Sequence, residues 1–121
     1  MKPLFHSTIV RIGGMVNDFL QEETLILFNQ DVPAELHEMA ILHTKSEYAD
    51  PVRPGDYLLI RDKRLLITSV GEKANETLQS IGHCTVKMDG SDVPQLPGMI
   101  HVERDVLPPL EIGNVIAFVR S

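Results

Sequence analysis

Turn-forming residues recur at short intervals along the whole chain, and this close spacing of turns limits the fold more than any other feature of the sequence. The clearest breaks are Gly13-Gly14, Pro54-Gly55-Asp56, Asp89-Gly90, Pro97-Gly98 and Gly113-Asn114. Between the breaks lie runs of about five to eight residues rich in Val, Ile, Leu and Thr, the length and composition of β-strands. The predicted strands are Phe5–Ile12, Thr24–Asn29, Met39–Thr44, Tyr57–Arg61, Arg64–Val70, His83–Met88, Met99–Glu103 and Val115–Arg120. Many short strands separated by glycine and proline turns favour a barrel or a sandwich, so we predict an all-β fold: a small, mainly antiparallel β-barrel.

Helical segments are predicted to be few and short. Glu72–Ile81 contains good helix formers and is followed by Gly82, which is typical of the residue that ends a helix. Val16–Leu20 and Ala34–Met39 are each long enough for one or two turns. Because no longer window shows a strong apolar stripe with a 3.6-residue period, the sequence argues against a helical bundle.

The size and charge of the chain exclude several classes of protein. Its 121 residues suit one domain, so we expect a single functional unit over residues 1–121. The chain carries 11 Lys and Arg against 17 Asp and Glu, a net charge of −6. Nucleic-acid binding requires a basic face that neutralises phosphates, and this acidic balance argues against it.

The cysteine content and the hydropathy pattern predict a cytoplasmic location. Cys84 is the only cysteine, so the chain forms no internal disulfide. No apolar run approaches the roughly 20 residues of a membrane-spanning helix, and the N-terminus lacks an apolar stretch of signal-peptide length. We therefore expect no direct membrane insertion.

The common catalytic motifs are missing. The chain has no phosphate-binding Gly-rich loop, no Gly-x-Ser-x-Gly and no His-Glu-x-x-His. Cys84 alternates with Val86 and Met88 along a predicted strand, so it is expected in the core rather than as a nucleophile.

Histidine is the residue type that remains for chemistry. Five are present, at positions 6, 37, 43, 83 and 101. Strand alternation predicts that His83 and His101 lie on the polar faces of their strands. His43 ends the apolar run Ile41-Leu42 just before a polar turn, where we expect it to be held by the sheet and reachable from solvent.

Three interpretations of these histidines stay open from the residues alone. They are ordinary strand residues, or three of them hold a metal on the barrel wall, or one is a nucleophile that accepts an acyl or phosphoryl group. The last requires hydrogen-bond donors near the ring. Thr44, Lys45 and Ser46, directly after His43, are of the right type.

The chain resembles, almost end to end, the sorbitol (glucitol)-specific IIA components of the bacterial sugar phosphotransferase system. The order and spacing of the matching stretches make the resemblance specific. They are Thr8–Gly13, Pro33–Leu36, Ile41–His43, Pro54-Gly55, Thr68–Gly71, Asn75–Leu78, Gly82–Val86, Asp89-Gly90, Pro97–Val102 and Gly113–Phe118.

This resemblance implies a phosphocarrier that needs no cofactor and no metal. Such a component takes a phosphoryl group from the general histidine phosphocarrier protein and passes it to the IIB component, while the membrane-embedded IIC component moves the sugar. The family's acceptor falls on His43, and His83, His101, Lys45 and Thr44 are candidates for contacts to the phosphoryl group. Some members carry a second histidine two positions after the acceptor, where this chain has Lys45.

Two other functions remain alternatives at this stage: a small-molecule-binding β-barrel without catalysis and a metal-dependent β-barrel enzyme. Transfer of label from a phosphorylated carrier, or stoichiometric metal, would separate them. Exposed edge strands invite pairing between copies, so a homodimer is a further expectation.

Overall fold

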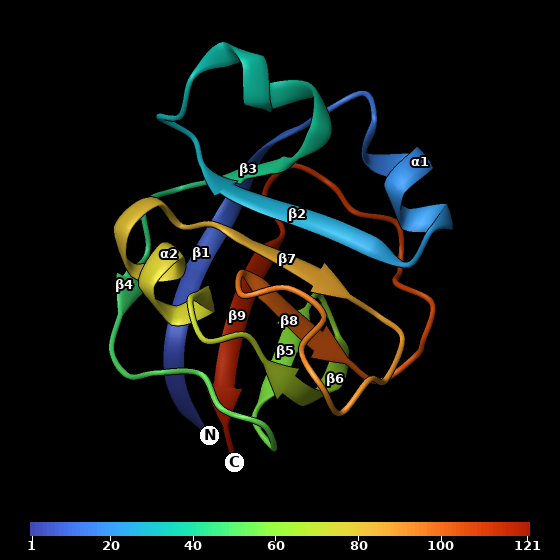
Figure 1. The fold of residues 1–121 in the computed structure, drawn as a ribbon. Helices are drawn as coiled ribbons and strands as arrows, with labels where there is room; N and C mark the ends of the chain where they lie inside the picture. The colour runs from blue at the N-terminus through green and yellow to red at the C-terminus, as the bar shows by residue number, and fades with distance from the viewer.

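Nine strands form one sheet that closes on itself as a barrel in the computed structural model, which describes residues 1–121 (Figure 1). The strands are β1 Lys2–Ile12, β2 Thr24–Asn29, β3 Ile41–His43, β4 Glu47–Tyr48, β5 Tyr57–Ile60, β6 Lys63–Val70, β7 Cys84–Lys87, β8 Met99–Val102 and β9 Val115–Arg120. Their order is β3-β2-β7-β8-β6-β5-β9-β1, and pairing of β1 with β3 closes the ring. β4 extends the sheet from β1.

The barrel is mixed but mainly antiparallel, which confirms the predicted fold class. Only β2–β3 and β7–β8 are parallel pairs. A parallel pair requires a crossover connection, whereas antiparallel neighbours are joined by a short turn. Residues 30–40 and 88–98 supply these two crossovers. Closure of the sheet leaves β4 as its free edge. The homodimer was expected because edge strands invite pairing between copies, and the closed barrel leaves few such edges.

Three short helical segments cover the barrel: α1 Val16–Gln21, the 3₁₀ helix η1 Ala34–Met39 and α2 Ala74–Ile81. All three were predicted within two residues of their observed bounds. α2 ends at Gly82, which adopts a left-handed conformation with φ +62° and donates its N–H to the Leu78 carbonyl. No helix has the length and apolar composition needed to cross a membrane.

Two apolar clusters explain the pattern of buried residues. The larger fills the barrel and contains 21 buried side chains, including Cys84, as predicted. The smaller lies outside the barrel wall and consists of Phe28, Ala40 and Leu42, packed against residues of η1. β2 and β3 are therefore buried on both faces, and this is why the run Ile41-Leu42-His43 shows no alternation of polar and apolar residues.

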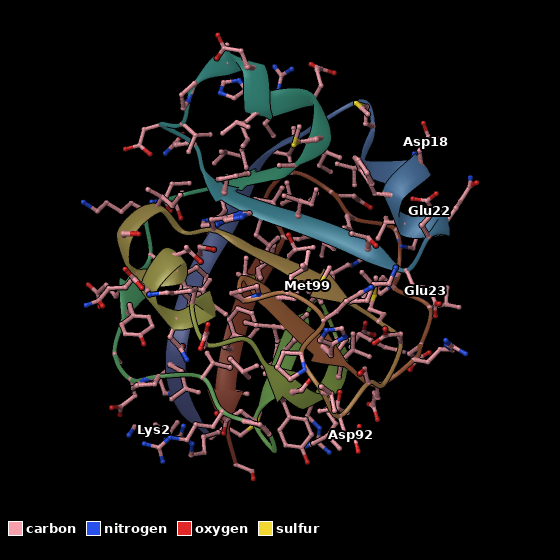
Figure 2. All side chains as sticks on the ribbon, viewed as in Figure 1. Lys2, Asp18, Glu22, Glu23, Asp92 and Met99 are labelled. Carbon is pink, nitrogen blue, oxygen red and sulfur yellow. The ribbon has the colours of Figure 1, made fainter.

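Charged side chains lie on the outside. Figure 2 shows Asp18, Glu22 and Glu23 together around the end of α1. Glu23 has a positive φ of 59° and pairs with Arg104, whose Nε lies 2.7 Å from Glu23 Oε2.

One nearly buried ion pair fastens the last strand to the loop before β5. Asp56 is 3% exposed. It accepts hydrogen bonds from Arg120 Nε at 2.9 Å and from the Arg53 N–H at 2.7 Å. Burial by itself would raise the pKa of Asp56, but the hydrogen bonds from Arg120 and Arg53 outweigh it and hold this pKa below its ordinary value. The pair therefore stabilises the fold in the ionised form of Asp56.

Asp56→Asn should lower the free energy of unfolding by about 2 kcal/mol at neutral pH, because the Arg120 guanidinium loses its charged partner. A carboxyl with a depressed pKa stabilises above its unfolded pKa of about 3.9 and loses this contribution as the pH falls through its folded pKa. The difference between wild type and variant should therefore shrink below about pH 4. Urea unfolding from pH 3 to 7 measures it. The exposed Asp62→Asn variant, which makes the same charge change, is the control; equal effects in both would contradict the assignment.

Candidate functional site

His43 ends β3 and points into the barrel. Its strand neighbours are Asn29 on β2 and Ile9 on β1. The imidazole packs edge-on against the Phe5 ring, with centroids 5.6 Å apart and planes at 84°. The residue is 0% exposed, so the prediction that this strand-end imidazole is reachable from solvent is wrong. The reason is that the junction between α2 and β7 covers the end of β3.

Both ring nitrogens of His43 face backbone carbonyls. Nδ1 lies 2.8 Å from the Thr44 oxygen and Nε2 lies 2.8 Å from the Gly82 oxygen. A neutral imidazole has a single N–H and can donate to only one of the two. In the neutral ring the other nitrogen therefore directs its lone pair at a carbonyl oxygen. Since only a nitrogen with a free lone pair is a nucleophile, attack by His43 requires one carbonyl to withdraw.

Gly82 is the residue that allows this close approach. A Cβ at position 82 would lie 2.0 Å from Asn29 Oδ1 and 2.6 Å from His43 Cε1. The left-handed backbone that ends α2 also favours glycine. One glycine thus ends the helix and leaves room for the His43 ring and the Asn29 amide.

Two polar side chains beside His43 each contain a buried oxygen that makes no hydrogen bond. These atoms are Asn29 Oδ1 and Ser7 Oγ. Ser7 lies on β1 between Phe5, which contacts the His43 ring, and Ile9, which pairs with His43. Sequence reasoning missed both residues. The signal was present for Asn29, because it continues the inward alternation of Leu25 and Leu27 along β2.

His83 lies on the other side of the barrel wall. Its ring stacks on Phe28 at 4.1 Å with an interplanar angle of 9°, and Phe28 belongs to the outer apolar cluster. His83 Nδ1 donates to the Leu27 carbonyl at 3.0 Å. Burial lowers the pKa of His83 despite that hydrogen bond, which favours the neutral ring. His83 adjoins Gly82 in the chain, but its ring and that of His43 lie on opposite faces of the sheet.

His101 is remote from His43, because β2 and β7 lie between their strands. It lies on the outer face of β8, opposite the core residues Ile100 and Val102, as predicted, but it is 0% exposed because residues 89–98 cover that face. Its Nδ1 donates to Asp89 Oδ1 at 2.8 Å, and its Nε2 accepts the Gln95 N–H at 3.1 Å. With both nitrogens engaged, His101 anchors the crossover between β7 and β8.

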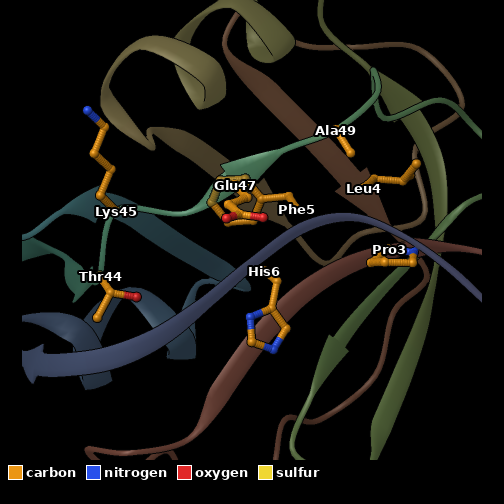
Figure 3. Close-up of a pocket in the computed structure, with 8 residues that line it drawn as sticks. All are labelled: Pro3, Leu4, Phe5, His6, Thr44, Lys45, Glu47 and Ala49. Carbon is orange, nitrogen blue, oxygen red and sulfur yellow. The ribbon is translucent and has the colours of Figure 1, made fainter.

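Thr44 and Lys45 border an open cleft next to the site (Figure 3). Its volume is about 460 Å³, and it is lined by Pro3, Leu4, Phe5, His6, Thr44, Lys45, Glu47 and Ala49. Phe5 and Thr44 also contact the His43 ring, so this cleft adjoins residues that hold the ring. The Lys45 side chain extends away from the other labelled residues in Figure 3. Thr44 is held in place by β1, since its Oγ1 accepts the Thr8 N–H at 3.1 Å.

The remaining candidates for chemistry are limited. No three His, Cys, Asp or Glu side chains converge in a way that could hold a metal ion. Burial raises the pKa of the Cys84 thiol, which keeps it protonated and unreactive. The site therefore centres on His43, with Asn29, Ser7, Thr44 and Gly82 around it.

Comparison with known proteins decides the family. Residues 4–117 match the family model described as PTS system glucitol/sorbitol-specific IIA component. The chain belongs to this family. It is 32% identical over 118 residues to the glucitol/sorbitol-specific EIIA components of Shigella flexneri and of Escherichia coli K12, covering 98% of this chain and 96% of each relative.

A solved structure shows the same architecture. The crystal structure of a PTS system IIA component from Enterococcus faecalis V583 is similar with a TM-score of 0.80 at 28% sequence identity, covering 94% of this chain and 98% of that one. The resemblance stated from the sequence is confirmed by these matches.

Gly82→Ala should destabilise the protein by clearly more than the roughly 1 kcal/mol cost of a left-handed alanine, because its methyl group displaces Asn29 and the His43 ring. Gly90→Ala is the matched control, since Gly90 has a similar φ of +70° and its Cβ would meet no atom closer than 4.0 Å. Thermal unfolding of both variants measures the difference. Equal losses would show that the space beside His43 is not restrictive.

His101→Leu should lower the free energy of unfolding by about 1–3 kcal/mol, because Asp89 and the Gln95 N–H lose a buried partner. The His43 ring should be unaffected, since β2 and β7 lie between β3 and β8 in the barrel. Chemical denaturation, together with ¹⁵N NMR of the His43 ring nitrogens, tests both statements. Altered His43 resonances would contradict the separation of the two histidines.

Proposed function

We propose that this protein is a cytoplasmic phosphocarrier that accepts a phosphoryl group on His43 from the general histidine phosphocarrier protein. It passes the group to the IIB component of a sorbitol (glucitol) permease, whose IIC component lies in the membrane. Membership of the IIA family supports the role, and so does the resemblance that aligns His43 with the family's acceptor. The single observation that carries the choice of residue is the environment of His43, whose two ring nitrogens face carbonyls beside two unpartnered polar side chains.

The proposed transfer is an in-line exchange between two imidazoles. The lone pair of one His43 nitrogen attacks phosphorus and forms an N–P bond. The N–P bond to the histidine of the carrier breaks, and its electron pair returns to that ring. The other His43 nitrogen keeps its proton. Its N–H donates a hydrogen bond to the neighbouring backbone carbonyl, and this bond fixes the tautomer and the orientation of the ring. Since phosphoryl transfer passes through a loose transition state, the protein contributes positioning and charge stabilisation.

The enclosed His43 must become accessible before it meets a partner. Two short backbone segments hold the ring through their carbonyl groups. One contains Thr44, which borders the open cleft, and the other contains Gly82 at the end of α2. Withdrawal of either segment frees one nitrogen. A shift of this size is a local opening, which costs less than unfolding the barrel. The proposal is thus a closed resting state that opens when the carrier docks.

The surface charge suits a brief encounter. A net charge of −6 would speed association with a carrier that presents a basic patch. A relay protein has to release each partner, so a small and transient interface is expected.

His43→Gln should fold normally and take up no phosphate, because an amide nitrogen is not a useful nucleophile. The assay incubates the protein with labelled phosphoenolpyruvate, enzyme I and the carrier, then tests the bound phosphate for loss in acid and stability in base, as expected of a phosphoramidate. His37→Gln is the matched control, because His37 lies on η1 and donates to the Val32 carbonyl. Acid-labile phosphate on His43→Gln would make another histidine the acceptor.

The same assay separates the alternative functions. A binding module without catalysis would leave the wild-type protein unlabelled. Stoichiometric metal in the purified protein, with loss of activity on chelation, would instead indicate a metal-dependent enzyme.

A further inference from the structure

The barrel holds two buried side-chain oxygens without a hydrogen-bond partner, and both belong to residues that flank His43. Asn29 is 6% exposed and Ser7 is 2% exposed. A buried polar atom without a partner costs stability, so folded proteins contain few of them and each calls for a physical explanation. Their position on either side of one histidine suggests that the missing partner is something that this histidine carries.

The Asn29 amide is an immediate neighbour of the ring edge. Asn29 and His43 are paired across β2 and β3. The position that a Cβ of Gly82 would occupy is 2.0 Å from Asn29 Oδ1 and 2.6 Å from His43 Cε1. Since Cε1 lies between the two ring nitrogens, an amide beside it is within reach of a group attached to either one.

Nothing fixes the direction of this amide. An asparagine side chain has two N–H donors and one carbonyl acceptor, which exchange places when the amide turns over. Because Oδ1 has no donor to hold it, the turn breaks no hydrogen bond at that oxygen. Arrival of a negatively charged group would therefore orient the N–H donors toward it.

Ser7 offers a second neutral donor from β1. Its hydroxyl can rotate to present hydrogen to an acceptor. Phe5 and Ile9, its inward-facing neighbours on the strand, are the residues that contact and pair with His43. Asn29 and Ser7 thus approach the ring from the strands on opposite sides of β3.

We propose that Asn29 and Ser7 are phosphoryl-contact residues, whose side chains donate hydrogen bonds to the oxygens of the phosphoryl group on His43. This inference rests on the proposed phosphocarrier function. Donors that are already in place where negative charge will sit stabilise it without reorganisation. The two residues assume the role that the sequence suggested for Lys45, whose exposed side chain extends away from the other cleft residues labelled in Figure 3.

The first experiment compares initial rates of phosphoryl uptake from the phosphorylated carrier. Asn29→Asp keeps the shape of the side chain but replaces the N–H donors by a carboxylate that repels phosphoryl oxygens. It should slow uptake about 100-fold, and Ser7→Ala about 10-fold, the order expected for loss of one positioned donor. The matched controls are Asn17→Asp and Ser80→Ala, at exposed positions on α1 and α2, which should retain the wild-type rate.

The second experiment needs no variant and so does not depend on how Asn29→Asp folds. Wild-type protein is labelled with ¹⁵N, and the side-chain amide signals are recorded before and after phosphorylation. The Asn29 amide protons should move downfield on phosphorylation, as expected of new hydrogen bonds to an anion. The exposed amide of Asn17 should not move.

The outcomes separate this inference from the function on which it rests. Wild-type rates in both Asn29→Asp and Ser7→Ala, or an Asn29 amide that does not respond to phosphorylation, would overturn the inference and leave the phosphocarrier function intact. If the wild-type protein takes up no phosphate, the proposed function fails and the inference fails with it.

Discussion

The contact between His43 Nε2 and the Gly82 carbonyl is the interaction on which the rest of the site depends. It joins two segments that are 39 residues apart, the end of β3 and the end of α2. Gly82 has to be a glycine to allow it, and the Asn29 amide fits into the same space. The barrel supplies the frame, because β3 is held between β1 and β2 and cannot shift without opening the ring of strands. The Gly82 carbonyl thus covers one ring nitrogen of the central imidazole, and the Thr44 carbonyl covers the other.

Much of the fold follows from the sequence, because its strands are short and their turns carry clear signals. The bounds of β2 and β9 were predicted correctly, as were those of η1. β4 was missed, since a strand of two residues has no period to detect. The sequence predicted a barrel but not which strands close it, because pairing of β1 with β3 depends on contacts far apart in the chain. The class of the fold, including its closure as a barrel, was therefore predictable, whereas the order of its strands was not.

The burial of His101 has a cause that strand alternation cannot reveal. Strand alternation assigns one face to the core and the other to solvent, and this holds only where the outer face is uncovered. η1 covers the outer face of β2 and β3, and residues 89–98 cover that of β8. For this reason His101 is buried although it lies on the outer face that strand alternation assigned to it. Family resemblance pointed to His43 but gave no indication of Asn29 or Ser7, because the lack of a hydrogen-bond partner for their buried oxygens is visible only in three dimensions.

The pairing of the first strand with the last has a consequence for how the protein is made. Lys2 pairs with Arg120, and β1 and β9 run side by side from the two adjacent termini (Figure 1). Contacts between residues so far apart in sequence form slowly, because a long loop must close before they stabilise anything. During synthesis β1 has no partner in β9 until residues 115–120 have left the ribosome. The barrel therefore cannot be completed before residues 115–120 are available, and the nascent chain has to keep its apolar first strand from aggregating until then.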